Sequence, residues 1–285
     1  MRLPSPPSPR PPTWAEPGAP PLGHLWAEPP LQSTLGHALP VSSLVGAGSA
    51  LRLRRLLSPP QPRAAAADEA QRLARPGAFD GPVVGLRDAT LHNGTLHGTL
   101  GVGRWSTARA LEGGPRLSPS GRLPPLRHSH RLNDIGIIVL VVDPDDRVWV
   151  ARRARGMGLR GGRWSATASG GLEPSDGPAV GSWTETHLGN AALRELQEET
   201  GLGTSAVGPP ALLGLVREWR RGGKPEATFL VRARRPLPAA RLRPSAEISL
   251  LRAIPMQQLR ADHRLWAEAD LTLRLSLSLL LDARA

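Results

Sequence analysis

The segment from Asn190 to Leu202 carries a helix start signal and a helix stop signal, with three glutamates between them. Asparagine is favoured at helix N-caps, and Gly201 is the residue type that most often ends a helix. Helical spacing places the following side chains on an inward face: Leu193, Leu196 and Thr200. It places the acidic side chains on one stripe of the other side: Glu195, Glu198 and Glu199. The segment therefore predicts a helix with a high local negative charge.

Three carboxylates on one helical stripe repel one another by roughly 0.2–0.5 kcal/mol per pair. Arg194 is the only cation within the segment, so most of this repulsion needs another partner. Carboxylate oxygens suit hard divalent cations such as Mg2+ and Mn2+, and a bound cation would offset the repulsion. The alternative is a solvated acidic surface, because glutamate is a good helix former. The three carboxylates alone leave both interpretations open.

The composition excludes several kinds of chemistry. The 285 residues include no cysteine, which rules out disulfides, zinc–thiolate sites and thiol nucleophiles. The formal net charge is +12, and it is carried by arginines spread along the chain, since Lys224 is the only lysine. Scattered arginines favour a compositional drift over a nucleic-acid surface, so nucleic acid is not the expected partner. No apolar run of about eighteen residues predicts a membrane span, and a cytoplasmic protein is expected.

Changes in composition divide the chain into three predicted regions. Residues 1–62 are rich in proline and predict a disordered leader. Residues 63–127 predict a small α+β accessory region, with a short helix at 64–73 and a β-hairpin around an Asn-Gly turn at 93–94. Residues 130–285 predict the main domain, whose alternation of strands and helices is typical of an α/β/α layered fold.

Apolar runs bounded by turn signals predict the elements of the main domain. Strands are expected at 135–142, 148–153, 164–168, 212–219, 226–232 and 247–254. A short helix is expected from Pro255 to Leu259, because proline suits the first helical turn. Residues 265–281 predict a closing apolar helix, although their alternating leucines leave a strand open.

The segment Arg194–Leu202 resembles the core of the Nudix box, the pattern R-E-U-x-E-E-x-G-U in which U is a bulky aliphatic residue. All seven specified positions match: Arg194, Glu195, Leu196, Glu198, Glu199, Gly201 and Leu202. The resemblance covers about residues 130 to 285 and implies a Nudix-type α/β/α sandwich with a mixed sheet. A strand hairpin ending in two arginines and a Gly-Gly turn before the helix agree with that fold.

The resemblance implies a hydrolase that cleaves a diphosphate linked to another group, with Mg2+ or Mn2+ as cofactor. It assigns metal binding to the helix carboxylates: Glu195, Glu198 and Glu199. The expected catalytic set comprises four residues: Glu198, Glu195, Arg194 and Glu247. In this assignment Arg194 braces the carboxylates through ion pairs. Glu247 would supply a base or a further ligand from the start of the last strand, with Glu218 and Glu226 as competing candidates.

The first half of the box departs from the family pattern G-x5-E-x7-R. Arg194 follows Gly171 by 23 positions, whereas the pattern requires 14, so about nine residues are inserted between 174 and 189. The position eight before Arg194 holds a threonine in place of the expected glutamate. Two neighbouring acids could replace that glutamate, namely Glu173 and Glu185, and the sequence leaves the choice open.

The substrate contacts are expected around the strand ends. The proposed contact residues are Gly170, Gly171, Arg153 and Arg217. Trp164 and Trp219 could stack a base, but core packing is the default for tryptophan. A short stretch from Phe79 to Leu91 is similar to the N-terminal segment of UDP-glucose diphosphatase-like Nudix proteins, which implies a nucleotide sugar as substrate.

Three functional alternatives remain. The first is a metal-dependent hydrolase of a nucleoside diphosphate derivative, a small-molecule partner, acting as a monomer or a homodimer. The second is a Nudix-fold module that binds a ligand without turnover, which the displaced box glutamate favours. The third is a polyanion-binding protein driven by arginines, whose affinity would depend strongly on salt. The intact set of three helix glutamates favours the hydrolase.

Overall fold

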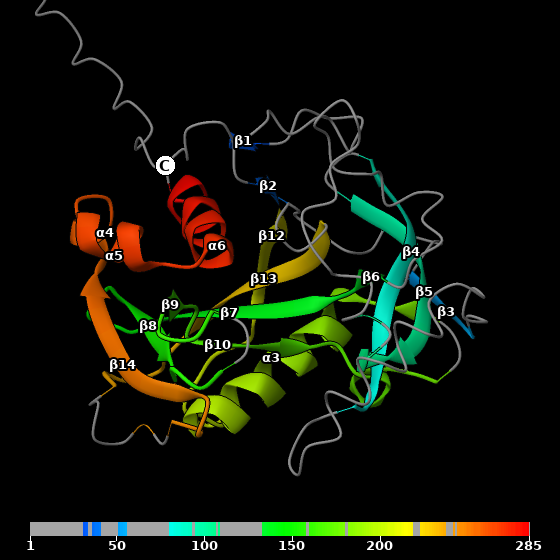
Figure 1. Ribbon diagram of the computed structural model, residues 1–285, viewed down its shortest axis with the longest axis horizontal. Coiled ribbons are helices and arrows are strands. Elements are labelled where there is room, and N and C mark those ends of the chain that lie inside the picture. The colour runs from blue at the N-terminus through cyan, green and yellow to red at the C-terminus, as the bar shows by residue number, and fades with distance from the viewer. Residues whose placement is uncertain are drawn as a thin grey trace, which may run out of the picture.

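The protein is described here by a computed structural model, in which a sheet flanked by helices adjoins a second sheet (Figure 1). The described residues are 31–33, 36–40, 51–55, 80–92, 95–106, 108, 133–157, 160–179, 182–218, 223–237, 242 and 244–284. The predicted helix at 64–73 and most of the predicted leader lie outside them. Three short strands fall within the leader: β1 (Leu31–Ser33), β2 (Gly36–Pro40) and β3 (Leu51–Arg55).

The main sheet has the strand order β1-β2-β12-β13-β7-β8-β14, while β10 pairs with β7 and β9 pairs with β8. Its strands in the main domain are β7 (Gly136–Val142), β8 (Arg147–Arg153), β9 (Trp164–Ser165), β10 (Ala168–Gly171), β12 (Ala211–Glu218), β13 (Lys224–Arg232) and β14 (Ile248–Pro255). Strands β13 and β7 run parallel, and the other pairs run antiparallel. The sheet is therefore mixed, as the α/β prediction requires.

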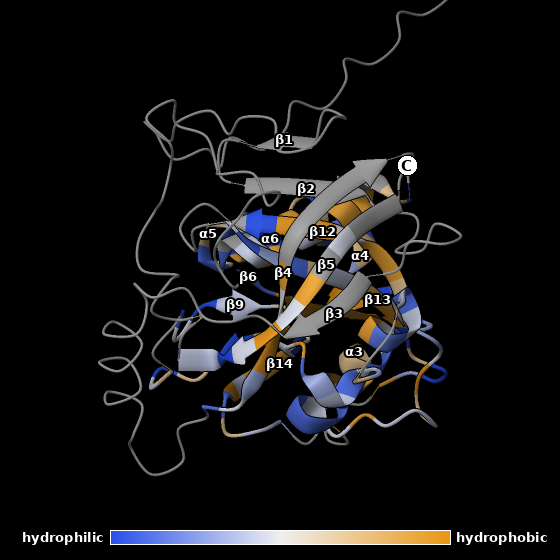
Figure 2. Ribbon diagram, turned by 90° about the vertical axis from the view of Figure 1, so that its right-hand side faces the viewer, coloured by the Kyte–Doolittle hydropathy of each residue, from blue (hydrophilic) through white to orange (hydrophobic). Residues whose placement is uncertain are grey.

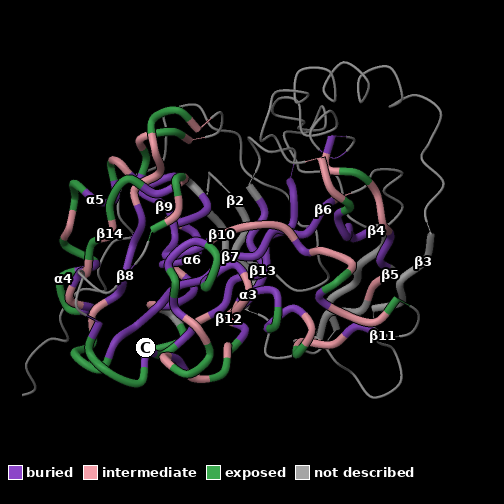
Figure 3. Tube along the Cα trace, turned by 90° about the horizontal axis from the view of Figure 1, so that it is seen from below, coloured by how far each residue is buried: buried purple, intermediate pink, exposed green. Residues whose placement is uncertain are grey.

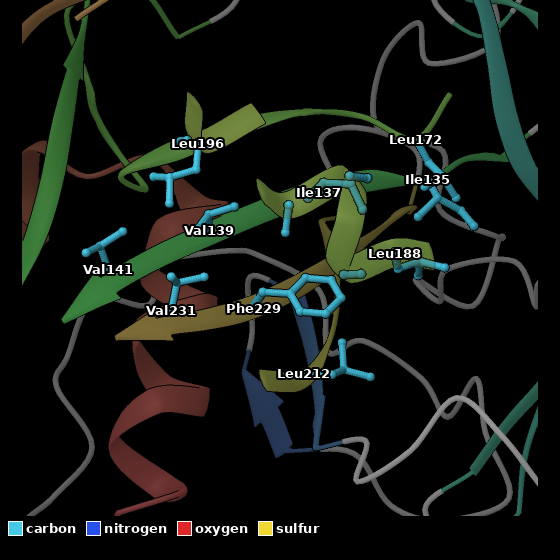
Figure 4. Packing of buried hydrophobic residues seen from close by; sticks show 14 of the residues in the cluster. Ile135, Ile137, Val139, Val141, Leu172, Leu188, Leu196, Leu212, Phe229 and Val231 are labelled. Carbon is cyan, nitrogen blue, oxygen red and sulfur yellow. The ribbon is translucent and has the colours of Figure 1, made fainter. Parts of the chain in front are cut away.

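Strand β7 is buried on both faces because helices cover each side of the sheet. Alternate side chains on one face pack with the long helix α3 (Glu185–Thr200): Ile137, Val139 and Val141 (Figure 4). Those on the other face pack with the C-terminal helices: Ile138, Leu140 and Val142. These helices are α4 (Met256–Leu259), α5 (His263–Glu268) and α6 (Leu271–Asp282). The continuous apolar run in the sequence thus becomes the centre of a three-layer sandwich.

Hydropathy and burial follow the same layers. Figure 2 shows hydrophobic residues concentrated in the strands of the main sheet, with hydrophilic residues along the outer turns of α3. Figure 3 shows β7 and β8 buried through most of their length, with exposed residues around α4 and α5. None of the helices in the described part of the chain is long and apolar enough to cross a membrane.

A second sheet has the order β11-β3-β5-β4-β6. Its centre is the predicted hairpin, β4 (Pro82–His92) paired antiparallel with β5 (Thr95–Arg104), which confirms that prediction. The main domain adds β6 (Asn133–Asp134) and β11 (Ser182–Trp183), and the leader adds β3. The second sheet therefore draws strands from all three regions that the composition suggested, and the division into three domains stays a prediction.

Backbone hydrogen bonds join the two sheets at the start of β7. The amide of Val84 donates to the carbonyl of Leu172 at 2.8 Å, and the amide of Ile135 donates to the carbonyl of Val84 at 2.9 Å. The amide of Leu172 completes the set by donating to the carbonyl of Ile135 at 2.9 Å. The second sheet is thus hydrogen-bonded to the segment that leads from Gly170 and Gly171, at the end of β10, toward α3.

Helix α3 begins earlier than the sequence suggested. The expected N-cap was Asn190, but the helix is capped by Thr184, whose amide donates to Nδ1 of His187 at 2.9 Å. Asn190 lies inside the helix and is exposed to solvent, so its preference for caps is not used. The predicted end is confirmed, because Gly201 adopts a left-handed conformation with φ of 76° that suits glycine.

The closing apolar segment forms two helices instead of one. Asp262 caps α5 and Asp270 caps α6, each by accepting a hydrogen bond from a backbone amide three residues later. The cap at Asp270 starts a new helix, because its own amide donates to the carbonyl of Trp164 and so turns the chain. The strand alternative for this segment is wrong, since the leucines of α6 are buried nearly all around.

Candidate active site

The C-terminal half of α3 carries the three predicted metal-binding glutamates, and their environments differ. Glu195 and Glu199 are 7% and 8% exposed, because positions four apart share the helix face that meets β10. The side chain of Glu198 is 59% exposed. The helix therefore offers two enclosed carboxylates and one carboxylate that is free to face a ligand from solvent.

Strand β10 approaches these carboxylates with its backbone. A Cβ atom on Gly170 would lie 2.0 Å from the carboxylate carbon of Glu195, so any side chain here would displace that carboxylate. The amide of Ser169 donates to Oε2 of Glu199 at 3.0 Å. The predicted Gly-Gly turn is the end of strand β10 instead, and the missing side chain of Gly170 leaves the space that the Glu195 carboxylate fills.

Arg194 is surrounded by acidic groups, as the bracing role predicted. Its Nη1 lies 2.8 Å from Oε1 of Glu195 and 3.3 Å from Oε2 of Glu198. Its Nη2 donates to the carbonyl oxygen of Gly171 at 2.9 Å. The guanidinium of Arg194 thus connects two predicted metal ligands on α3 to Gly171, the last residue of β10.

Asp176 makes the strongest contact with Arg194, and the sequence reasoning did not select it. Its two carboxylate oxygens accept from Nε and Nη2 of Arg194 at 2.9 Å and 3.0 Å, a bidentate pair. Burial opposes the charge of Arg194, but the hydrogen bonds to Asp176 and the nearby carboxylates raise its pKa above the ordinary value. An acid five positions after Gly171, one short of the family spacing, was the available signal.

The two candidates for the displaced box glutamate lie in different places. Oε1 of Glu173 is 3.8 Å from Nη1 of Arg194, so this side chain belongs to the cluster. Glu185 is the first residue of α3, which puts it about 15 Å along the helix axis from Glu195 at the usual rise per residue. The inserted residues fold as a short 3-10 helix (Pro174–Asp176) followed by β11, and they bring Glu173 and Asp176 to the arginine.

Burial raises the pKa values of the two enclosed glutamates. Burial raises the pKa of Glu195 to about 7, although the charge of Arg194 and its hydrogen bond pull in the other direction. Burial raises the pKa of Glu199 to about 8, with the charges of Glu195 and Glu247 adding to the effect and the amide of Ser169 opposing it. Each anion is costly without a further positive charge, since burial disfavours the charged form.

The donor set suits a hard divalent cation. Two buried carboxylates with raised pKa values, a third exposed carboxylate on the same helix and the absence of sulfur ligands match the preferences of Mg2+ and Mn2+. Within the described residues, no three acidic or imidazole side chains are already arranged to hold a metal ion. Glu198 is directed toward Arg194 at 3.3 Å, so its side chain would have to turn to join Glu195 and Glu199 around a cation.

Arg153 and Glu247 form an ion pair next to Glu199. Arg153 is the last residue of β8, and its Nη2 lies 3.1 Å from Oε2 of Glu247. The turn that holds Glu247 is attached to α3, because the amide of Ser245 donates to the carbonyl of Glu199 at 2.9 Å. The structure therefore brings both residues, taken from distant parts of the sequence, to the carboxylate cluster.

Arg217 is buried, unlike the other residues predicted to contact the substrate. Its side chain is 1% exposed, and its Nε donates to the carbonyl of Gly223 at 2.5 Å. Burial lowers its pKa to about 9. A substrate arriving from solvent does not reach this guanidinium in the present conformation, so its binding role stays a prediction.

The remaining candidates have structural partners or fall outside the described side chains. Glu226 is buried and accepts a hydrogen bond from Thr272 at 2.6 Å, on the α6 side of the sheet. Trp164 is buried, with the guanidinium carbon of Arg152 5.6 Å from the ring centre. The side chain of Glu218 and all of Trp219 lie outside the described residues.

Comparison with known proteins gives one family match. The family model for the NUDIX domain matches residues 132–275, about half of the chain. A search of curated proteins finds no match. Among solved structures, the MutT protein from Methanosarcina mazei Go1 is 14% identical, with 53% of this chain and 96% of that chain covered and a TM-score of 0.38. The Nudix hydrolase RenU from M. smegmatis is 19% identical, with 53% and 84% covered and a TM-score of 0.37.

Proposed function

This chain belongs to the NUDIX domain family and is a hydrolase of diphosphate bonds, and from that premise we propose that it cleaves a nucleoside diphosphate derivative with Mg2+ or Mn2+. The observation that carries the proposal is the pair of enclosed carboxylates, Glu195 and Glu199, beside the exposed Glu198. A buried pair of anions has an energetic need for a cation, which a diphosphate substrate brings with it.

A bound divalent cation would neutralise the diphosphate and lower the pKa of an attacking water. The chain's own residues would do the rest. We assign the cation to Glu195, Glu198 and Glu199, with Arg194 holding Glu195 in place through its ion pair and Glu198 turning from Arg194 toward the cation. Arg153 would bind a phosphate oxygen, because arginine recognises phosphates through charge-assisted hydrogen bonds. Glu247, on the turn next to Glu199, would take the proton from the water.

The group attached to the diphosphate is proposed to be a sugar. The support is the similarity of the segment from Phe79 to Leu91 to nucleotide-sugar diphosphatases of the family. Nucleic acid is a poor candidate, because arginines of β8 and of the loop after it already have protein partners. Nη2 of Arg152 lies 3.4 Å from Glu268, Nη1 of Arg160 lies 3.4 Å from Asp270, and Arg163 donates to the carbonyl of Ala267.

The second candidate function is ligand binding without turnover. It is favoured by the displaced box glutamate, because the position eight before Arg194 holds a threonine. Gly170 and Gly171 at the end of β10, together with Arg153, would then bind the diphosphate, with no role for Glu247 in proton transfer.

The test is cleavage of a panel of nucleotide sugars, dinucleotides and nucleoside triphosphates with Mg2+ or Mn2+, followed by chromatography of the nucleotide products, because hydrolysis of the diphosphate bond converts each compound into two phosphorylated products. The wild type is expected to turn over at least one of them. The double substitution Glu198→Gln with Glu199→Gln should lower kcat by about a thousandfold or more, the scale on which metal-assisted chemistry is lost. Glu268→Gln, which changes a carboxylate on α5 away from the cluster, should leave kcat within about twofold.

Tight binding of one compound without cleavage of any would establish the second candidate instead. If the double substitution lowers kcat no more than Glu268→Gln does, Glu198 and Glu199 are excluded as metal ligands. Manganese affinity, measured by electron paramagnetic resonance on the same variants, separates a lost metal site from a site that binds metal without chemistry.

A further inference from the structure

Most of the hydrogen-bonding capacity of Arg153 is unused. Its Nη2 donates to Glu247 at 3.1 Å, and its Nη1 makes only a 3.5 Å contact with the hydroxyl of Ser169. Its Nε is buried and has no hydrogen-bond partner among the described residues. A guanidinium carries five N–H donors, and a buried donor without a partner costs free energy. Arg153 is therefore set for a ligand with more acceptor oxygens than Glu247 supplies.

The backbone that carries Glu247 is held in place, whereas its side chain is not. Its carbonyl accepts from the amide of Ala154 at 2.7 Å, and its amide donates to the hydroxyl of Ser245 at 3.3 Å. The side chain is 47% exposed, and Arg153 is its only ion-pair partner among the described residues. The carboxylate can therefore leave Arg153 by rotation of its own side chain, with no movement of the turn.

We propose that Glu247 occupies, in the substrate-free protein, the position on Arg153 that a diphosphate oxygen takes when substrate binds. Carboxylate and phosphate oxygens use the same arginine donors, so the two compete for them. Each phosphate of a diphosphate linkage has at least two non-bridging oxygens and can accept from both Nη1 and Nη2, whereas Glu247 accepts from Nη2 alone, which favours the exchange. This inference rests on the proposed function, because it makes substrate binding the event that releases Glu247.

The exchange would couple binding to catalysis. Without substrate, the carboxylate of Glu247 is paired with Arg153, close enough to Glu199 for both charges to act on it. Once the diphosphate holds Arg153, Glu247 is released beside Glu199, where a water needs a base. The base then becomes available only when a phosphate is bound.

The test measures the binding of inorganic diphosphate by calorimetry in the presence of EDTA. Glu247→Gln removes the competing charge and keeps the shape, so diphosphate should bind about fivefold more tightly, the scale of a half-exposed ion pair. Arg153→Gln should weaken binding. In the Arg153→Gln background, Glu247→Gln should change Kd by less than about twofold, because no competition remains.

Glu268→Gln is the matched control, since it also removes one negative charge next to an arginine of β8, at Arg152. It should leave Kd within about twofold. An unchanged Kd for Glu247→Gln would overturn the exchange, as would tightening that persists without Arg153 or that Glu268→Gln reproduces. Tighter diphosphate binding by Glu247→Gln, together with no turnover by the wild type, would support the exchange and contradict the proposed function.

Discussion

At the scale of single residues, the candidate site depends on a glycine as much as on its charged groups. The carboxylate of Glu195 occupies the space in which Gly170 has no side chain. Gly171, the next residue, has no such neighbour, because its nearest atom to an added Cβ would be a methyl carbon of Val83 at 4.0 Å. The two adjacent glycines therefore make a matched pair for experiment.

Gly170→Ala is expected to displace the carboxylate of Glu195 and weaken Mn2+ binding by tenfold or more, about 1.4 kcal/mol. Gly171→Ala should leave Mn2+ affinity within about twofold. Electron paramagnetic resonance titration gives both affinities, and thermal unfolding with EDTA checks that each variant is folded. Equal Mn2+ affinities for the two variants would exclude Glu195 as a ligand or show that the turn adjusts.

At the scale of elements, the hairpin β7–β8 is organised by one buried aspartate. Asp143 accepts from the backbone amides of Asp145 and Arg147, each at 3.1 Å, and from the indole nitrogen of Trp149 at 3.0 Å. The side chain of Arg147 adds a contact of 2.8 Å. Burial would raise the pKa of Asp143, but the hydrogen bonds from Arg147 and Trp149 outweigh it and hold the pKa below the ordinary value.

Asp143→Asn should lower the free energy of unfolding by about 1–3 kcal/mol at pH 7, because it removes charge-assisted bonds to buried donors. A lowered pKa means that the stabilisation is present above the unfolded pKa, near about 4, and is lost as pH falls through the folded value. The difference between wild type and variant should therefore shrink toward about pH 3. Urea unfolding at the two pH values measures it, and a difference independent of pH would contradict the charged role.

At the scale of the whole molecule, Trp183 connects the second sheet to helix α3. This residue lies in the insertion that expands the box, is fully buried and belongs to one cluster with Leu86 and Leu100 of the second sheet and Leu188 of α3. Its indole nitrogen donates to the carbonyl of Pro178 at 3.0 Å. The insertion thus forms part of the core that the two sheets share.

Trp183→Ala should lower the free energy of unfolding by about 3–5 kcal/mol, the usual cost of emptying such a space. Because the residue belongs to one cluster with the second sheet and the start of α3, amide hydrogen exchange should accelerate together in β4, β5 and the start of α3. Exchange that accelerates in β4 and β5 alone would show that the accessory sheet opens independently of the helix. A Trp183→Phe variant, which keeps most of the apolar contact, should show a smaller effect.

The sequence by itself determined the family, the acidic helix and most of the strands. Periodic burial, turn residues and the nine-residue box are local patterns, and local patterns can be recognised without knowing what packs where. They identified the buried run of β7 and the Gly201 stop, and they predict the metal-binding role of Glu195, Glu198 and Glu199. They misplaced the start of α3, because Asn190 has the right residue type for a cap but lies within a helix that already begins at Thr184.

Only the tertiary structure decided which distant groups meet. Asp176 lies in the insertion and hydrogen-bonds to Arg194, and Glu173, the residue before the insertion, lies 3.8 Å from the same arginine. Glu185, at the start of α3, lies about 15 Å from Glu195 along the helix axis. Arg153 and Glu247 meet because β8 and β14 are neighbours in the sheet, although they are far apart in the chain. Contacts of this kind depend on chain folding over long separations, and spacing along the sequence carries no direct record of them.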